Sequence, residues 1–385
     1  MDNTTLDAET LRLLRESLER YGCDQYTMAI RRAAMATPDG FSRKAWRDYS
    51  DMGWLAMPLS AAQGGFDSAP QSVGALMQYA GATLAMEPLL AQVVFCGRLL
   101  QLIGSPAALA HLESLGAGDV LFAFAHAEHS GDGMVGEVHS TWSAGTLTGR
   151  KLVVLHGDVA DRFIVTARGP QGRLGLYMVD ARQPGVARES FRLVDGRGAA
   201  NLTLDAASAV ELTPGRDADE LVQRMLDDAR LALCAEAYGA SKALNALTLA
   251  HLKDRQQFGK PLGVNQTLQH RMVELFILEE EGRAVMAAAY RAEAVERRAA
   301  ILAASAHLMS LARLASHEAV QLHGGIGITE EYAVSHYFRR LMVVNRLLGD
   351  RARHVREFAA EAQRAAFAAH VHEPVQRALE GAVPA

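Results

Sequence analysis

The sequence predicts a mainly helical α+β protein of three domains, because the hydrophobic pattern of the chain changes character twice. Apolar residues recur at helical spacing up to about residue 118, short β-rich runs follow, and the helical pattern returns near residue 214. Helices, strands and helices in this order indicate segregated layers rather than a doubly wound sheet. We therefore expect an N-terminal α-domain at residues 1–118, a middle antiparallel β-domain (a barrel or sandwich) at 119–213 and a C-terminal helical bundle domain at 214–385.

Glycine and proline punctuate the helices expected in the N-terminal domain. Residues 43–52 form a short amphipathic pattern that ends at Gly53, since glycine is common just after a helix. Residues 71–86 and 89–103 are apolar on most faces, which predicts two buried helices. Pro106 then marks the start of another helix.

The middle domain is predicted from runs of β-forming residues that glycine-containing turns separate. Short strands at regular spacing are typical of a small antiparallel barrel or sandwich. The expected strands are 120–125, 142–147, 151–155, 163–165 and 174–179.

The C-terminal domain is predicted as five helices, each with a stripe of apolar residues to bury. Four of them would form a bundle. The expected helices are 217–252, 264–296, 298–323, 329–345 and 350–369.

Composition excludes several classes of function. The net charge of −5 gives no electrostatic reason for binding nucleic acid. The cysteines, Cys23, Cys96 and Cys234, form no CxxC pair, so neither a zinc ribbon nor a thioredoxin-type site is expected. The N-terminus has no basic region before an apolar run, and no stretch of about 18 uninterrupted apolar residues predicts a membrane span. We expect a cytoplasmic protein with reduced thiols.

The break between the first two C-terminal helices contains residue types suited to a nucleotide. Arg255 offers a planar fork of N–H donors for phosphate, and Phe258 offers a face on which a base can stack. Gly259 and Pro261 set turns and end the helix. On composition alone, an ordinary helix–turn–helix joint with solvated polar residues explains the same stretch equally well.

The pattern Arg-x-Gln-Phe-Gly-x-Pro-x-x-x-x-Gln, which starts at Arg255, resembles the flavin-binding signature of the acyl-CoA dehydrogenase family. A second match, Gln-Leu-His-Gly-Gly-Ile-Gly at 321–327, lies at a family-like separation. Together they are similar to the small subunits of heteromeric acyl-CoA dehydrogenases of the pimeloyl-CoA and steroid types. The resemblance implies the acyl-CoA dehydrogenase fold with a C-terminal four-helix bundle. It also implies FAD as cofactor, an acyl-CoA substrate and an electron-transfer flavoprotein as electron acceptor.

The resemblance assigns the cofactor contacts of the first motif residue by residue. Arg255 and Phe258 would contact FAD, with Gln257, Asn265 and Gln266 as further polar contacts. In the family this segment of one subunit reaches the pyrophosphate and the adenine.

The second motif implies an oligomer. Gln321, Gly324 and Gly325 would complete the dinucleotide site from a neighbouring subunit, in a homo- or hetero-oligomer such as a dimer of dimers with a paralogous large subunit. The glycines are also the expected C-cap of the preceding helix. Arg230 matches a family arginine near the acyl-CoA, although an exposed helix residue paired with a neighbouring acid is an alternative interpretation.

Around the flavin ring the sequence departs from the family. Residues 127–132 match the family's Thr-Glu-Pro and Gly-Ser-Asp elements only in part. Val153 and Leu155 stand where the family has an aromatic residue and a threonine. Those side-chain contacts to the ring would be missing, while backbone N–H groups of residues 124–127 would remain at a strand edge.

The larger departure concerns the catalytic base. Removing the α-proton of an acyl thioester requires a carboxylate in a dry pocket, where its pKa is raised. Leu348 occupies the position of the family's glutamate, and Ala229 occupies the position that other members use. Asp350 and Asp228, the nearest carboxylates, lie one or two positions away. We expect a partner subunit of the same fold to supply the base.

The expected function is therefore α,β-desaturation of an acyl-CoA by an FAD-containing subunit of a heteromeric enzyme. One alternative is a homo-oligomeric dehydrogenase or oxidase that uses a displaced carboxylate such as Asp350. Another is a non-catalytic paralogue that stabilises a partner subunit. No metal site is expected, because His126, Glu128 and His129 lie on a β-rich segment, where successive side chains project to different faces.

Overall fold

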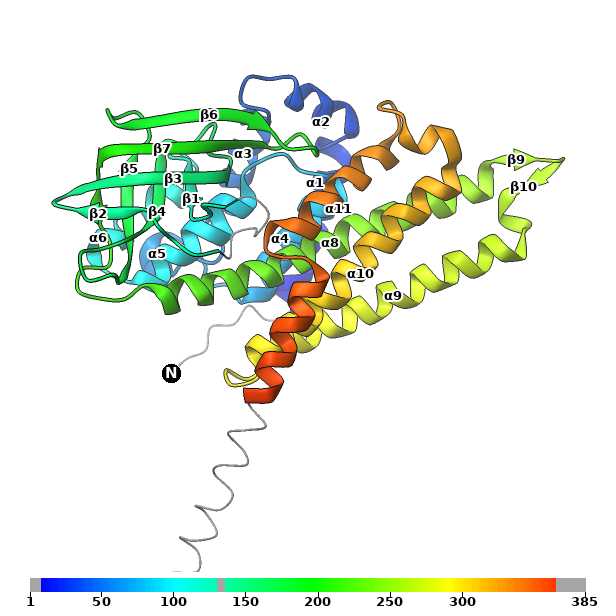
Figure 1. Ribbon diagram of the computed structural model, residues 1–385. Coiled ribbons are helices and arrows are strands. Elements are labelled where there is room, and N and C mark those ends of the chain that lie inside the picture. Colours follow the sequence, from blue (N-terminus) through cyan, green and yellow to red (C-terminus); the bar gives the residue numbers. More distant parts are fainter. Residues whose placement is uncertain (1–7, 130–135, 365–385) are drawn as a thin grey trace, which may run out of the picture.

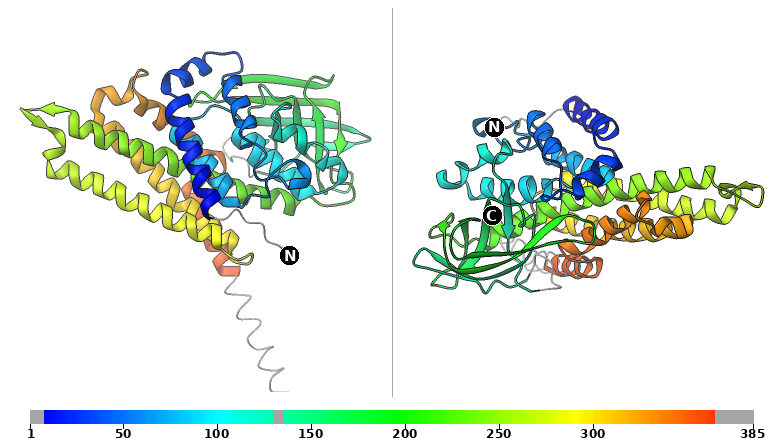
Figure 2. Two further views of the ribbon diagram at one scale, coloured as in Figure 1. Left: turned by 180° about the vertical axis from the view of Figure 1, so that it is seen from behind. Right: turned by 90° about the horizontal axis from the view of Figure 1, so that it is seen from above.

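The structure, a computed structural model, describes residues 8–129 and 136–364. Figure 1 shows the β-domain beside the N-terminal helices, while the long C-terminal helices extend away from both, and Figure 2 shows the same division from behind. One hydrophobic core joins the two helical domains and one face of the sheet, and a smaller core lies within the β-domain. Adjacent residues of one strand enter different cores, as Ile164 and Val165 do, because strand side chains alternate between faces.

The N-terminal domain is helical, as expected. The helix predicted at 71–86 ends at Thr83, because Leu84 takes a left-handed conformation with φ of 56°. The helix predicted at 89–103 starts as a π-helix and continues as an α-helix. The elements are α1 (Ala8–Gln25), α2 (Met28–Met35), α3 (Arg43–Asp51), η1 (Ala61–Gln63), α4 (Pro70–Thr83), η2 (Leu90–Gly97), α5 (Arg98–Ile103), α6 (Pro106–Leu109) and α7 (Leu112–Gly116).

The middle domain contains an eight-stranded sheet in the order β6-β7-β3-β2-β4-β5-β8, with β1 also paired to β4. The pairing is mostly antiparallel, but β1 and β2 pair with β4 in parallel. The strands are β1 (Phe122–Ala125), β2 (Thr141–Ser143), β3 (Thr146–Leu155), β4 (Arg162–Arg168), β5 (Leu174–Asp180), β6 (Val186–Arg192), β7 (Gly198–Ser208) and β8 (Val210–Glu211).

The prediction of separate strands at 142–147 and 151–155 is wrong. Ala144 and Gly145 form a turn with φ of 49° and 87°, so the first run belongs to two strands, and β3 continues through Leu155. The sequence prediction also misses β6, β7 and β8. β6 is largely exposed and rich in Arg, Glu and Ser, and β7 is rich in alanine, so neither has a strongly β-forming composition.

The C-terminal domain is organised around α8 (Asp219–Asp254), which packs against α4, α9, α10 and α11. The helix expected at 264–296 covers only 266–291, because a 3₁₀ turn precedes it and residues 292–296 connect it to the next helix. The helix expected at 350–369 begins at 351, and its residues after 364 lie outside the described chain. The remaining elements are β9 (Gln256–Gln257), β10 (Lys260–Pro261), η3 (Leu262–Val264), α9 (Gln266–Arg291), α10 (Arg297–His323), η4 (Gly324–Ile328), α11 (Ala333–Leu347) and the helix at 351–364.

A buried cluster of charged side chains joins the three domains. Asp195, between β6 and β7, lies 2.7 Å from Nε of Arg197 and 2.9 Å from Nε of Arg340 on α11. Glu236 on α8 lies 3.0 Å from Nη1 of Arg340 and 3.3 Å from Nη1 of Arg197. Arg31 on α2 donates to the carbonyl oxygen of Asp195 at 3.1 Å. These side chains are at most 4% exposed, so each charge depends on its partners for compensation.

Two glycines allow α4 and α8 to approach closely. A Cβ on Gly81 would lie 2.0 Å from the carbonyl oxygen of Glu236, and a Cβ on Gly239 would lie 2.0 Å from that of Gln78. Because close-packed interiors cannot absorb such overlaps, a larger residue at either position must push the two helices apart.

Among the described residues, one helix, Arg297–Ile328, is long and apolar enough by composition to cross a membrane. More than half of its apolar window is buried inside the protein, as in the core helix of a bundle. All three cysteines are free thiols, of which only Cys23 is exposed.

Candidate functional site

The segment that the sequence singles out forms a hairpin that projects beyond the end of α8 (Figure 1). β9 and β10 pair antiparallel, and the turn between them places Phe258 at φ of 54° and Gly259 at φ of 77°. Two consecutive positive φ angles fit a type I′ turn, which matches the twist of a two-residue hairpin. The left-handed conformation is unfavourable for phenylalanine, and the residue is nonetheless 98% exposed. A strained, exposed aromatic side chain points to contact with another molecule.

The polar residues around this hairpin are also accessible. Arg255, Gln257 and Gln266 are exposed, and no hydrogen bond or ion pair engages their side chains within residues 8–129 and 136–364. Asn265 differs, because its amide nitrogen donates to the carbonyl oxygen of Leu262 at 2.9 Å. Its amide therefore also shapes the turn before α9.

The glycines of the second motif lie in η4, directly after α10. Gln321, Gly324 and Gly325 are exposed. Gly324 requires glycine for its φ of 64°, which agrees with its expected role in ending the helix. Gly325 has no such φ, and a Cβ there would meet nothing within 4 Å. Neither packing nor backbone conformation therefore requires glycine at Gly325.

Stacked histidines connect the two motifs. The rings of His251, near the end of α8, and His323, at the end of α10, are 4.2 Å apart at an interplanar angle of 27°. Tyr332 packs against His323 from the other side of η4, at 5.2 Å. The hairpin and η4 thus share one end of the bundle, and both motifs face that end with exposed residues.

The region that corresponds to the family's ring site is built on a buried ion pair. Lys151, with a side-chain exposure of 0%, donates to Glu128 at 2.6 Å. It also donates to the carbonyl oxygen of His126 and to the hydroxyl of Thr166, both at 3.2 Å. Glu128 accepts a further hydrogen bond from the backbone N–H of Ser140 at 3.0 Å. Burial lowers the pKa of Lys151 to about 8, against the opposing attraction of Glu128.

Around this pair the side chains offer little to a flavin ring. Val153 is 42% exposed with φ of 51°, and Leu155 is 2% exposed within the main core. The backbone donors expected at 124–127 lie on a segment whose residues are all buried, and β4 occupies one edge of β1. The carbonyl oxygen of Ala127 is also engaged, because it accepts from the N–H of Leu152 at 2.7 Å.

A cavity of about 290 Å³ lies beside His126, between the β-domain and α8. Arg230 lines it and is 2% exposed, so its interpretation as an exposed helix residue is wrong. Its guanidinium lies 2.6 Å from Asp227 and 3.2 Å from Glu357, and Arg298 pairs with the same two acids. Burial, together with the nearby lysine charge, lowers the pKa of His126 to about 4, so this histidine is neutral near pH 7.

None of the positions considered for a catalytic base offers a free carboxylate. Leu348 is 2% exposed and Ala229 is 0% exposed. Asp350 accepts from the backbone N–H of Arg353 at 2.9 Å, and this hydrogen bond holds the pKa of Asp350 below its usual value. Asp228 lies between two arginine side chains. A carboxylate with a lowered pKa is a weak proton acceptor, which makes Asp350 a poor replacement for the missing base.

Two features of this region escape sequence reasoning. The partner of Arg230, Glu357, comes from the last described helix, and no local pattern links residues so far apart in the chain. The stack of His251 on His323 is equally remote in sequence. Within the described ranges, no group of three or more His, Cys, Asp or Glu side chains is arranged to hold a metal ion.

Comparison with known proteins agrees with these features. The sequence profile of the acyl-CoA dehydrogenase C-terminal domain matches residues 220–363. Acyl-CoA dehydrogenase IpdE2 of Mycobacterium tuberculosis is 27% identical over 333 residues, which cover 86% of this chain and 91% of the relative.

Solved structures match over almost the whole chain. A variant of the steroid ACAD Tcur3481-Tcur3483 superposes with a TM-score of 0.84 at 27% identity, covering 93% of this chain and 99% of that chain. The ChsE4-ChsE5 complex from Mycobacterium tuberculosis gives a TM-score of 0.84 at 24% identity, covering 94% and 99%. Motifs, fold and relatives agree: residues 220–363 form an acyl-CoA dehydrogenase C-terminal domain, and almost the whole chain is similar to acyl-CoA dehydrogenases, which are FAD-dependent oxidoreductases.

Proposed function

We propose that this chain is an FAD-binding subunit of a heteromeric acyl-CoA dehydrogenase and that it lacks its own catalytic base. The observation that supports this most directly is Leu348, an apolar residue 2% exposed at the family's base position. General base catalysis contributes about 10²–10⁴-fold in rate, so the chain alone would be nearly inert. A paralogous partner would supply the glutamate, and an electron-transfer flavoprotein would accept the electrons.

The relatives support a two-chain assembly and a bulky acyl group. One similar structure is named as a steroid ACAD and another as a complex of two proteins. By extension we propose a steroid-like or dicarboxylic acyl-CoA as substrate and the cytoplasm as the location of the assembly.

The residues of this chain fit the dinucleotide end of FAD better than the ring end. Arg255 provides unengaged donors for the pyrophosphate, and Phe258 provides an exposed face for the adenine. Gly325 leaves open space where a ligand could approach the backbone. At the ring end, Val153 provides no aromatic face, and the cavity beside His126 is lined by ion-paired arginines. The ring would therefore be held mainly by the partner chain.

The length of α8 supports the same division between two chains. Arg230, beside the cavity, and Asp254, at the base of the hairpin, are 254 − 230 = 24 residues apart in one continuous helix. At 1.5 Å per residue this separation is about 36 Å, longer than a dinucleotide cofactor. The hairpin would reach a cofactor seated in another subunit, since Figure 1 shows it at the end of the bundle away from the β-domain.

The two chains would have different parts in the reaction. Bound FAD would supply the hydride acceptor for the β-hydrogen of the acyl-CoA, and a base would remove the α-proton. The part of this chain would be to bind and orient the pyrophosphate and adenine through Arg255 and Phe258. Its apolar Leu348 would leave the proton transfer to the partner.

The poor ring site favours one further candidate, a non-catalytic paralogue that only stabilises its partner. Both possibilities are tested by anaerobic mixing of the purified chain with a panel of acyl-CoA thioesters, with and without the paralogous chain, while flavin absorbance is followed. We expect bleaching only when both chains are present. Bleaching by the lone chain would overturn the proposal, and a complex whose acid extract contains no FAD would favour the structural paralogue.

Variants of the hairpin sharpen this test. Within the complex, Arg255→Gln and Phe258→Ala should each weaken FAD retention by about tenfold, because each removes a contact with the cofactor. Val295→Ala is the matched control, since Val295 is 96% exposed in the connection that follows α9, at the end of that helix away from the hairpin. Equal FAD content in all three variants would remove the hairpin from the cofactor site.

A further inference from the structure

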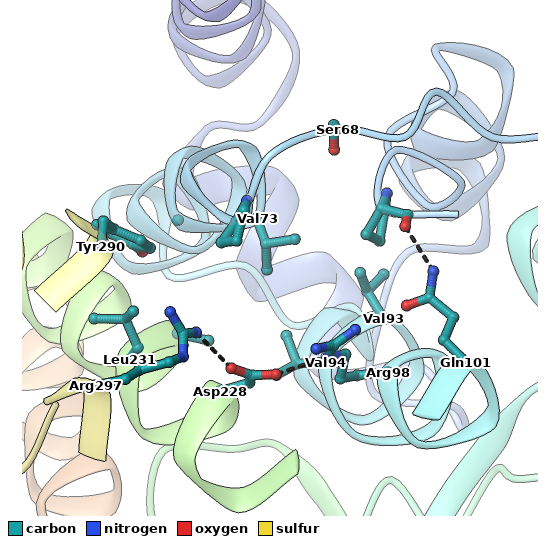
Figure 3. A pocket seen from close by; sticks show the side chains of 14 residues that line it. Ser68, Val73, Val93, Val94, Arg98, Gln101, Asp228, Leu231, Tyr290 and Arg297 are labelled. Atoms are coloured by element: carbon teal, nitrogen blue, oxygen red, sulfur yellow. Dashed lines mark hydrogen bonds and ion pairs between the residues drawn. The ribbon is translucent and has the colours of Figure 1, made fainter. Parts of the chain in front are cut away.

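A second cavity, of about 210 Å³, lies between the N-terminal domain and the bundle (Figure 3). It meets α8 at Asp228, Leu231 and Ala232, whereas the cavity beside His126 meets α8 at Val222, Gln223, Leu226 and Arg230. The two cavities therefore lie on different faces of α8. Apolar side chains make up much of the wall of the cavity of about 210 Å³: Val73, Val93, Val94, Leu231 and Ala232.

Two guanidinium groups share one carboxylate along this wall (Figure 3). Nε of Arg98 lies 2.7 Å from Oδ2 of Asp228, and Nη2 of Arg297 lies 2.6 Å from Oδ1. Each arginine uses a single nitrogen, and in the described part of the chain their other nitrogens have no hydrogen-bond partner. The side chains of Arg98, Arg297 and Asp228 are 39%, 30% and 19% exposed, so the unused donors remain accessible. The cluster has a net charge of +1.

Two further hydroxyl groups belong to this cavity. The hydroxyl oxygen of Ser68 is buried, has no hydrogen-bond partner among the described residues and points into the cavity in Figure 3. Gly74 leaves room for the hydroxyl of Tyr290, since a Cβ on Gly74 would lie only 2.1 Å from that oxygen. An unpartnered buried hydroxyl has an energetic reason to accept a ligand as its partner.

We propose that this cavity binds a small monocarboxylate with a short apolar chain. Guanidinium groups present paired N–H donors that match the two oxygens of a carboxylate. One negative charge neutralises the cluster, whereas a phosphate dianion would leave excess negative charge beside Asp228. Valine and leucine side chains would cover the apolar part of the ligand. The cavity volume of about 210 Å³ suits a small anion such as butyrate.

The site is tested on the full chain with sodium butyrate, followed by isothermal titration calorimetry at constant ionic strength. Neutral n-butanol and inorganic phosphate are the comparison probes. Saturable binding of one butyrate is expected, with n-butanol and phosphate each weaker by about tenfold or more. Equal affinity for butyrate and n-butanol, or no saturable binding of butyrate, would overturn the proposal. The test involves neither FAD nor a partner chain, so its outcome is independent of the proposed dehydrogenase function.

Two substitutions with opposite expected effects separate a binding role from a structural one. Arg98→Gln should weaken butyrate binding by about tenfold or more, because it removes a charged pair of donors. Asp228→Asn should strengthen binding, because it removes the carboxylate that competes for both arginines. Weakening by Asp228→Asn would contradict the proposal.

Two further variants distinguish a loss of butyrate binding from a loss of folding. Arg43→Gln removes a guanidinium from an exposed ion pair with Asp39 and should leave butyrate affinity unchanged. If Arg98→Gln fails to fold, Ser68→Ala keeps every charge and should still weaken binding by about threefold. Unchanged affinity in Ser68→Ala would then count against the site.

Discussion

Asp195→Asn should lower the free energy of unfolding by about 3–5 kcal/mol, because it breaks a buried ion pair from one side. The Asp195 carboxylate has 0% side-chain exposure and lies 2.7 Å and 2.9 Å from Nε of Arg197 and Arg340. Without the charge of Asp195, Glu236 would be the remaining carboxylate paired with Arg197 and Arg340 among the described residues. Two unit charges about 4 Å apart interact by about 4 kcal/mol at an effective dielectric constant of 20, and hydrogen bonds to asparagine offset part of the loss. Proteins of ordinary stability have about 5–15 kcal/mol in total, so the effect is large.

The pH dependence of this effect has a definite sign. Burial alone would raise the pKa of Asp195, but the charges of Arg197 and Arg340 hold it below its usual value. A carboxyl group with a lowered folded pKa stabilises the fold above its unfolded pKa of about 3.9, and that contribution is lost as the pH falls through the folded pKa. The stability difference between the natural chain and Asp195→Asn should therefore be constant near neutral pH and shrink below about pH 4.

Urea unfolding at pH 7, followed by far-UV circular dichroism, measures the loss. Asp39→Asn is the matched control, since Asp39 pairs with Arg43 at a site where the side chains are 37% and 47% exposed, and should cost less than about 1 kcal/mol. Adding Arg340→Met to Asp195→Asn removes an uncompensated charge and should restore part of the stability. If Asp195→Asn and Asp39→Asn lose the same stability within about 0.5 kcal/mol, the reasoning about buried charge is refuted.

Three further predictions concern other parts of the fold. Lys151 should contribute more to stability as the pH rises from about 8 to 10, because an unfolded lysine with a pKa of about 10.4 binds more protons than buried Lys151 with its pKa of about 8. The buried thiols of Cys96 and Cys234, whose pKa values are raised, oppose this rise in the natural chain and in Lys151→Met alike. The advantage of the natural chain over Lys151→Met in thermal melts should therefore grow over this range, and a constant difference would disprove it. Gly239→Ala should lower the free energy of unfolding in urea by about 1–3 kcal/mol, since its Cβ would lie 2.0 Å from a carbonyl oxygen of α4. Gly325→Ala should change this free energy little, and equal losses in the two variants would contradict the close contact of α4 and α8. Glu357→Gln should speed amide hydrogen exchange in the helix at 351–364, because it removes the ion pair at 3.2 Å that joins this helix to Arg230 on α8. Unchanged exchange would show that this ion pair does not stabilise the helix against local opening.

The long helices were predictable because their signal is local. Helical periodicity predicts 217–252 where α8 spans Asp219–Asp254, and 298–323 where α10 spans Arg297–His323. The breaker residues of the hairpin were equally visible, because glycine and proline limit the backbone wherever they occur. β6 and β7 were not predictable in this way, since their composition forms strands only when a neighbouring strand provides an edge: β3 pairs with β7, and β7 pairs with β6.

Of the candidate site, only the residues of the two sequence motifs could be predicted. Arg255, Phe258 and Gly325 could be named from the sequence, and their exposed positions are compatible with the proposed contacts. The ion pair that buries Arg230 could not be predicted, because Glu357 approaches it only after the chain has folded back on itself. Long-range pairing of charges leaves no periodic trace in a sequence, which is also why the cluster around Asp195 escaped notice.

The exposed apolar residues of the hairpin and α9 matter for the isolated chain. Phe258, Val273, Phe276 and Ile277 are 98%, 53%, 60% and 49% exposed, and the last three share one helical face. A net charge of −5 spread over 385 residues provides only modest repulsion between molecules. The isolated chain should therefore be limited by colloidal rather than conformational stability, and should self-associate while fully folded. Light scattering that grows with protein concentration, without loss of the far-UV signal, is the expected signature, and a partner covering this face would suppress it.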